Sequence, residues 1–265
     1  MQEVLVSRID LPTKTLKHKK DLVAEEAPLH ILLNQTHYVT ILCTPRQLKE
    51  LAVGHLLSEG LLKSTDEIRG MDLESDGKCV VRLKSHVNVE KQIAMAQPFA
   101  RLIVSACGST KYWPITKLMD RLDLPEISNG LKVDARVLRE SVKKLNKLAE
   151  VFRKTGGVHV AAVYSRDGRL LALAEDVGRH SAVDKVIGEC ALKGANFENC
   201  FVALSGRLTG DIVLKAARMR IPIVVSMAAA INSGTEVAKR TGITLVGFAR
   251  GNRMNAYTHT ERITF

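Results

Sequence analysis

Short apolar runs alternate with amphipathic segments along the second half of the chain. The runs predict β-strands, and the segments between them, where apolar residues recur at helical spacing, predict α-helices. An Arg-Asp-Gly sequence between the first two runs is typical of an antiparallel hairpin turn. Because the strand segments are apolar without alternation, we expect a sheet that helices cover on both faces. The predicted order is strands 158–165 and 169–175, helix 180–194, strand 201–205, helix 209–219, strand 221–227, helix 234–242 and strand 243–249.

Residues 134–154 have the pattern of one long amphipathic helix. Asp134 suits the N-cap, because a carboxylate there accepts a hydrogen bond from a free backbone N–H. Gly156 suits the left-handed position that ends many helices. The stripe expected to face the sheet consists of Leu138, Val142, Leu145, Ala149 and Phe152.

The first half of the chain predicts strands and one helix. The polar pair Asn34-Gln35 divides two extended apolar runs, and Pro45 suits the first position of the helix that follows. The predicted elements are strands 24–34 and 36–44, helix 45–60, and strands 78–84 and 99–107. Pro, Asn and Gly interrupt both periodicities over residues 124–130, which we interpret as a linker. We therefore expect a smaller mixed α+β domain over 1–128 and a layered α/β domain over 129–265.

The formal net charge of the 265-residue chain is +11. A basic surface favours anionic partners such as phosphates, nucleotides, nucleic acids or acidic protein faces. Aromatic residues make up only 4% of the chain, so the stacking platforms of single-strand binders are poorly supplied. No nucleic-acid recognition motif is present, and we expect no nucleic acid partner.

Neither a membrane span nor a secretion signal is predicted. No run approaches about 18 uninterrupted apolar residues, and the first twenty residues lack an apolar core with a small-residue cleavage site. We therefore expect a cytoplasmic protein. The five cysteines are odd in number, scattered and free of any CxxC pair, which argues against a disulfide framework or a structural metal. They are Cys43, Cys79, Cys107, Cys190 and Cys200.

Three predicted strands are followed by a glycine beside an arginine. Ligands of open α/β sheets bind at the carboxyl ends of the strands, glycine allows close approach, and arginine fits phosphate. Together the loops predict a site for a phosphorylated ligand, whereas any single pair is better explained as a solvated surface charge. His180 and Asp184, four apart on a predicted helix, are spaced to pair with each other. The loops are Gly178-Arg179-His180, Gly206-Arg207 and Arg250-Gly251-Asn252-Arg253.

Cys107 ends a predicted strand and precedes the polar residues Gly108, Ser109 and Thr110. Nearby Arg101 and Lys111 favour a thiolate. On local composition alone, a small structural cysteine fits the position better than a reactive thiol does. Hydrolytic deamination by zinc is not expected, because the chain lacks the P-C-x-x-C motif that zinc deaminases require beside H-x-E.

Several stretches resemble the formate dehydrogenase accessory sulfurtransferase family (FdhD). The resemblance runs from about Asp21 to the C-terminus, and its two most specific stretches are EDVGRHSAVDKVIG and GFARGNRMNAYTH. The others are VAEEAPLHILLN, LKELAVGHLLSEGLL, TGGVHVAAV and LSGRLTGDIVLKAAR.

The resemblance implies a sulfurtransferase that takes sulfur from a cysteine desulfurase as a persulfide on Cys107. It implies transfer of that sulfur to a molybdenum or tungsten bis-pterin guanine dinucleotide cofactor, before the cofactor enters the catalytic subunit of formate dehydrogenase. A homodimer is also implied, with a cytidine-deaminase-like α/β/α C-terminal domain that lacks zinc. Guanine nucleotide is expected to mimic the cofactor. The residues that match the family's cofactor-binding segment are Phe248, Ala249, Arg250, Gly251, Asn252 and Arg253.

The phosphate-rich ligand predicted from the loops at Arg179, His180, Gly206 and Arg207 agrees with the pyrophosphates of such a cofactor. The chain departs from the family in one loop, which often reads S-C-G-x-C, because Thr110 occupies the position of the second cysteine. Without that second cysteine a CxxC redox cycle is not possible, but persulfide transfer still is, because it needs only one thiolate. The main alternative is a protein that holds and delivers the same cofactor without moving sulfur. Such a protein needs the arginine loops but no reactive thiol.

Overall fold

The computed structural model describes residues 1–87, 124–128 and 130–265, so predicted strand 99–107, which includes Cys107, lies outside the described residues. A six-stranded mixed sheet forms the centre, in the order β13-β12-β11-β10-β8-β9. Strands β10, β11 and β12 are parallel, whereas β8 is antiparallel to both β10 and β9. The predicted hairpin and the mixed α/β class are confirmed. The strands are β8 (His159–Ser165), β9 (Leu170–Asp176), β10 (Cys200–Leu204), β11 (Ile223–Ser226), β12 (Thr244–Arg250) and β13 (Arg253–Thr258).

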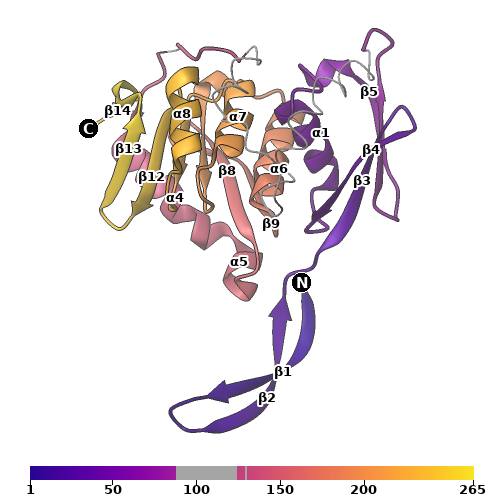
Figure 1. Ribbon diagram of the computed structural model, residues 1–265, viewed down its shortest axis with the longest axis vertical. Helices are drawn as coiled ribbons and strands as arrows, with labels where there is room; N and C mark the ends of the chain where they lie inside the picture. The colour runs from indigo at the N-terminus through magenta and orange to yellow at the C-terminus, as the bar shows by residue number, and fades with distance from the viewer. Residues whose placement is uncertain (88–123, 129) are drawn as a thin grey trace.

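Helices lie on both faces of this sheet (Figure 1). Helix α4 packs on one face, where Leu138, Val142 and Leu145 join an apolar cluster with strand residues such as Tyr164 and Phe201. The opposite face is covered by α6, α7 and α8. The predicted two-sided cover is confirmed. These helices are α4 (Ala135–Leu148), α6 (Arg179–Leu192), α7 (Gly210–Arg218) and α8 (Asn232–Thr241).

The predicted helix 134–154 is two helices, α4 and α5 (Glu150–Thr155). The chain leaves helical geometry at Ala149, where φ is −75° and ψ is 103°. The carboxylate of Glu175 on β9 accepts hydrogen bonds from the backbone N–H groups of Val151 and Phe152 at 3.0 and 2.7 Å. A distant side chain thus caps a second helix, which local periodicity does not reveal. The predicted cap at Asp134 is confirmed by its 2.7 Å bond from the Arg136 N–H.

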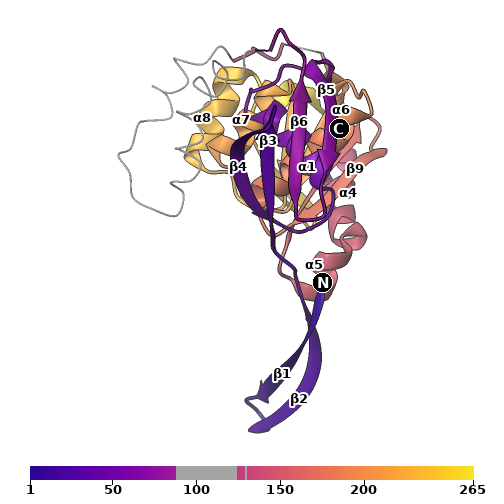
Figure 2. The same cartoon turned by 90° about the vertical axis from the view of Figure 1, so that its right-hand side faces the viewer.

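The first half of the chain forms a four-stranded sheet in the order β4-β3-β6-β5, and Figure 2 looks onto it with α1 behind. Asn34 and Gln35 both have positive φ, as the predicted turn requires. The helix begins at Leu48 and not at Pro45, because Gln47 takes a left-handed conformation before it. The elements are β3 (Ala27–Leu33), β4 (Thr36–Cys43), α1 (Leu48–Ser58), β5 (Ile68–Leu73) and β6 (Lys78–Leu83), of which β5 was not predicted.

Helices α1 and α6 touch backbone to backbone. A Cβ atom on Gly54 would lie 1.7 Å from the Asp184 carbonyl oxygen, and one on Gly188 would lie 1.9 Å from that of Glu50. Neither position accommodates a side chain without separating the helices. One apolar cluster continues from the four-stranded sheet through both helices to the six-stranded sheet. The division of the chain at residues 128 and 129 stays a prediction.

A buried ionic network crosses the same contact. Lys215 Nζ on α7 lies 2.9 Å from Asp184 Oδ1 on α6 and 2.5 Å from the carboxylate of Glu59, which follows α1. His55 Nδ1 is 3.2 Å from Asp184 Oδ2, and the Ser58 hydroxyl donates to Asp184 Oδ1 at 2.6 Å. Burial alone would raise the pKa of Asp184, but the charge of Lys215 and the bond to His55 outweigh it and hold that pKa below its ordinary value.

A hairpin of β1 (Gln2–Asp10) and β2 (Thr15–Val23) projects away from the body of the molecule (Figures 1 and 2). Within the part of the chain that the structure describes, no third strand pairs with it. Leu5, Ile9 and Leu11 on this hairpin are 74%, 67% and 81% exposed. No element was predicted here, because charged residues interrupt the alternation of apolar residues in β2.

Shorter elements complete the described chain. They are β7 (Val133–Asp134), β14 (Ile263–Thr264) and the 3₁₀ turns Thr65–Glu67, Phe197–Asn199 and Thr260–Arg262. Among the helices of the described residues, none combines the length and the apolar character needed to cross a membrane.

Candidate functional site

The predicted binding residues lie at one edge of the six-stranded sheet. Strands β10 and β12 run in the same direction, and β9 shares it because β8 is antiparallel to both of its neighbours. Their carboxyl ends therefore meet at one edge, where open α/β sheets bind ligands. The structure places the three Gly-Arg loops there in two separate groups, whose binding roles stay predictions.

The first group surrounds the start of α6. Arg179, Gly206 and Arg207 line a small cavity together with His159, the first residue of β8. A Cβ atom on Gly206 would lie 3.2 Å from the Arg179 Cβ and 3.6 Å from His159 Nδ1, so glycine permits this close arrangement. The N-terminal amides of α6 add positive potential for an anion.

The pKa of His159 is affected by its burial and by the positive charges of this group. Burial lowers the pKa of its imidazole, and the nearby charges of Arg179, His180 and Arg207 lower it further. Both effects favour the neutral form of the imidazole. His159 was not predicted because it begins an apolar strand, and its position opposite the loop after β10 depends on the antiparallel pairing of β8.

His180 does not pair with Asp184, contrary to the sequence-based expectation. Its Nε2 lies 2.5 Å from Asp211 Oδ2 on α7. Asp211 also accepts hydrogen bonds from the Thr209 hydroxyl and the Ile212 N–H. Burial would raise the pKa of Asp211, yet the hydrogen bond and charge of His180 hold it below its ordinary value. Asp184 is unavailable because it faces the interior, toward Lys215.

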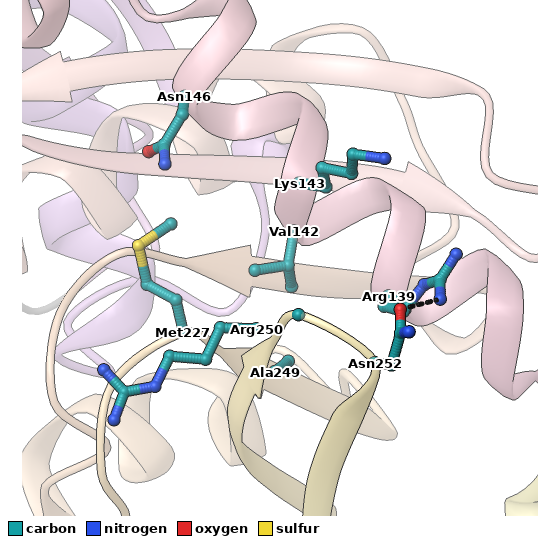
Figure 3. A pocket seen from close by; sticks show the side chains of 9 residues that line it. Arg139, Val142, Lys143, Asn146, Met227, Ala249, Arg250 and Asn252 are labelled. Atoms are coloured by element: carbon teal, nitrogen blue, oxygen red, sulfur yellow. Dashed lines mark hydrogen bonds between the residues drawn. The ribbon is translucent and has the colours of Figure 1, made fainter.

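The second group forms a pocket between α4 and the β12–β13 turn (Figure 3). The cavity volume is about 470 Å³, within the range of small-molecule sites. Four predicted residues line it, together with five that sequence reasoning missed. The predicted residues are Ala249, Arg250, Gly251 and Asn252, and the others are Arg139, Val142, Lys143, Asn146 and Met227.

Phe248 positions Arg250 in this pocket. The Arg250 guanidinium carbon lies 5.3 Å from the centre of the Phe248 ring, a cation–π contact. Phe248 has a φ of 51°, which is uncommon for an aromatic residue, and it coincides with a shift in strand register between Gly247 and Arg250. Arg253 begins β13 on the exposed side of the turn and is not among the residues that line the pocket.

Comparison with known proteins extends over nearly the whole chain. The model of the FdhD/NarQ family matches residues 24–264. The chain belongs to the FdhD/NarQ family. Two proteins named "Sulfur carrier protein FdhD" are close in sequence. That of Bacillus licheniformis is 33% identical over 251 residues, covering 94% of this chain and 93% of the relative. That of Methanothermobacter thermautotrophicus is 34% identical, covering 99% of this chain and 98% of the relative.

A solved structure shares the fold of this FdhD/NarQ family member. The crystal structure of a candidate formate dehydrogenase accessory protein from Desulfotalea psychrophila superposes with a TM-score of 0.76 at 27% identity. The match covers 99% of both chains. The resemblance that we identified from the sequence motifs is confirmed at the level of the family.

Hydrogen bonds link the two groups in this FdhD/NarQ protein. The Ser226 hydroxyl, at the end of β11, lies 2.6 Å from the Gly206 carbonyl oxygen and accepts from the Ala228 N–H at 3.0 Å. The Ala228 carbonyl in turn accepts from the Phe248 N–H at 2.9 Å. The ends of β10, β11 and β12 are therefore held at a fixed separation. Ser226 was not predicted, since it closes an apolar run with no local sign of this role.

Four of the five cysteines lie in the described residues, and all four are buried. Burial raises the pKa of Cys43 and Cys79 to about 11 and that of Cys190 to about 12. These thiols are protonated and unreactive near neutral pH. Cys107 lies outside the described residues. In the described part of the FdhD/NarQ chain, no three or more His, Cys, Asp or Glu side chains are grouped to hold a metal ion.

Proposed function

We propose that this chain is a sulfurtransferase that carries sulfur as a persulfide on Cys107. Its source is a cysteine desulfurase, and its destination is a molybdenum or tungsten bis-pterin guanine dinucleotide cofactor that formate dehydrogenase requires. The observation that carries the proposal is the family match over residues 24–264 together with relatives named as sulfur carriers. The two basic groups at the sheet edge support an anionic, nucleotide-containing ligand.

In the loading step, the Cys107 thiolate attacks the outer sulfur of the desulfurase persulfide. The sulfur–sulfur bond of the donor breaks, the desulfurase cysteine leaves as a thiolate, and the outer sulfur stays on Cys107. No net oxidation occurs, so the step needs one thiolate and no second cysteine. Thr110 at the second loop position is compatible with this chemistry.

In this proposal each part of the fold has a role. The six-stranded sheet acts as a cytidine-deaminase-like cofactor-binding unit, and the chain works as a cytoplasmic homodimer that meets the catalytic subunit of formate dehydrogenase. The cofactor would be held by arginines and backbone amides at the sheet edge. When bound, it supplies the metal that receives the sulfur.

Intact-mass analysis tests the proposal directly. After incubation with a cysteine desulfurase and free cysteine, the wild-type protein should gain the mass of one sulfur atom, and reduction should remove it. Peptide mapping should place the added sulfur on Cys107. If the protein stays unmodified while the desulfurase turns over, the chain is a binding protein that delivers the cofactor without moving sulfur.

Arg250→Ala should weaken binding of guanosine diphosphate without affecting sulfur loading. A charge-assisted hydrogen bond contributes about 1.5–3 kcal/mol, which corresponds to a roughly tenfold to hundredfold loss of affinity. Arg253→Ala should have the smaller effect, because its side chain does not line the pocket. Calorimetry at low salt gives the affinities, and binding should weaken as salt rises. Loss of loading with unchanged nucleotide affinity would place Arg250 in the desulfurase interface instead.

A further inference from the structure

We propose that α4 forms one wall of the nucleotide site, with Arg139 and Lys143 holding phosphate against the β12–β13 turn. The inference rests on the proposed function, because it assigns where in the chain the nucleotide part of the ligand binds. Nothing in the family's matching segment at 248–253 points to this helix, which precedes that segment by about a hundred residues.

The four α4 residues in the pocket lie at helical spacing. Arg139, Val142, Lys143 and Asn146 are separated by three, one and three positions, so they form one stripe along the helix. This stripe flanks the buried stripe that packs on the sheet, and Val142 belongs to both. The side of α4 beside the β12–β13 turn is therefore polar and basic at its rim and apolar at its base.

The charges of the pocket favour an anion. Arg139, Lys143 and Arg250 are cationic, and Glu140 on α4 contacts Arg139 at 2.6 Å and Lys143 at 3.8 Å. Arg139 also donates to Asn252 Oδ1 on the turn at 3.1 Å (Figure 3). Its Nε is buried and has no hydrogen-bond acceptor in the described part of the chain. A phosphate oxygen would supply the acceptor that this nitrogen lacks.

The base of the pocket suits the other half of a nucleotide. Val142, Met227 and Ala249 offer an apolar surface, and Figure 3 shows Val142 between α4 and the turn. A flat purine can pack on such a surface, while the amides of Asn146 and Asn252 offer donors and acceptors to its polar edge. Inorganic phosphate would use the rim alone and should bind more weakly.

The two basic groups differ in the volume of the cavities that they line. The cavity beside Arg179, Gly206 and Arg207 measures about 10 Å³, whereas the α4 pocket measures about 470 Å³. The smaller space is about that of one water molecule, so it does not admit a nucleoside. The first group can contact phosphate at the surface, and the nucleoside is assigned to the pocket against α4.

Calorimetric titration with guanosine diphosphate tests the assignment on the full chain. Lys143→Ala should lower the affinity about tenfold, and Arg139→Ala should do so by at least as much because it also releases Asn252. Lys144→Ala is the matched control, since it removes the same charge from the next position of α4 but does not line the pocket. It should stay within about twofold of wild type. Thermal unfolding of each variant checks that α4 remains folded.

Two results would overturn the assignment to this pocket while leaving the proposed nucleotide ligand and sulfur carriage intact. Equal losses in Lys143→Ala and Lys144→Ala would show that net charge alone attracts the nucleotide. Unchanged affinity in Arg139→Ala and Lys143→Ala, with loss in Arg179→Ala, would move the nucleoside to the first group. If folded wild type binds no guanosine diphosphate, this inference and the proposed nucleotide ligand both fail. Sulfur loading on Cys107 is measured separately by mass and decides the proposed function by itself.

Discussion

Cys107→Ala is expected to leave a folded protein that carries no transferable sulfur and supports no formate dehydrogenase activity. The reason is chemical, because alanine has no sulfur to form a persulfide and the thiols of Cys43, Cys79 and Cys190 are held protonated by burial. Activity should fall to the level of cells that lack the protein. The measurement is formate dehydrogenase activity in such cells, complemented with wild type or variant.

Two controls make this experiment specific. Thr110→Ala changes a polar residue close to Cys107 in sequence without removing the thiol, and it should retain sulfur loading. Cys107→Ala should bind guanosine diphosphate as wild type does, because none of the described residues that line the pocket against α4 is a cysteine. Full activity with Cys107→Ala or Cys107→Ser would show that the persulfide assignment is wrong.

Asp184→Ala should lower the free energy of unfolding by about 3–5 kcal/mol, the cost of removing one partner from a buried ion-pair network. Lys215 is 2% exposed and would lose one of its two carboxylates, leaving Glu59 to balance both Lys215 and Arg218. The midpoint of thermal unfolding should fall by on the order of 10 °C. Asp167→Ala is a suitable control, since this carboxylate lies in an exposed turn. Urea unfolding with a change under about 1 kcal/mol for Asp184→Ala would show that the network adds little to stability.

The lowered pKa of Asp184 also predicts how the stability of the protein changes with pH. The pKa of Asp184 is lower in the folded state than its unfolded value of about 3.9. Its contribution to stability is therefore complete above that unfolded value and is lost as pH falls toward the folded value. The pKa of Glu59 is also lowered, mainly by Lys215 against the opposing effect of burial. Between about pH 4 and 2, wild type should lose stability more steeply than Asp184→Asn.

The parts of the fold that follow from local pattern were predictable. Continuous apolar runs such as the one through Val224 indicated strands with both faces covered, and Asp134 marked the start of α4. The break at Ala149 was not predictable, because its cause is the carboxylate of Glu175 on another element. Strand β5 was not predicted, because charged residues and a glycine interrupt the alternation of apolar and polar residues over Ile68–Leu73.

The residues of the candidate site likewise include some that could be predicted from the sequence and some that could not. Glycine beside arginine after a strand is a local pattern, so Arg179, Arg207 and Arg250 could be placed at the sheet edge in advance. Lys143 could not, because a lysine on an amphipathic helix looks like any solvated charge until the helix is placed beside the β12–β13 turn. His180 was assigned the wrong partner, since helical spacing does not tell which side of the helix faces Asp211.

The projecting β1–β2 hairpin has a consequence for how the protein behaves at high concentration. Its outer edges carry backbone groups that another strand can pair with, and exposed Leu5 and Ile9 would add apolar contact to such a pairing. Strand β2 also carries Lys17, Lys19 and Lys20. Two hairpins that met edge to edge along β2 would bring these like charges together, so the lysines oppose fibre-like self-association. Replacing these lysines with threonine is therefore expected to make the protein aggregate more readily.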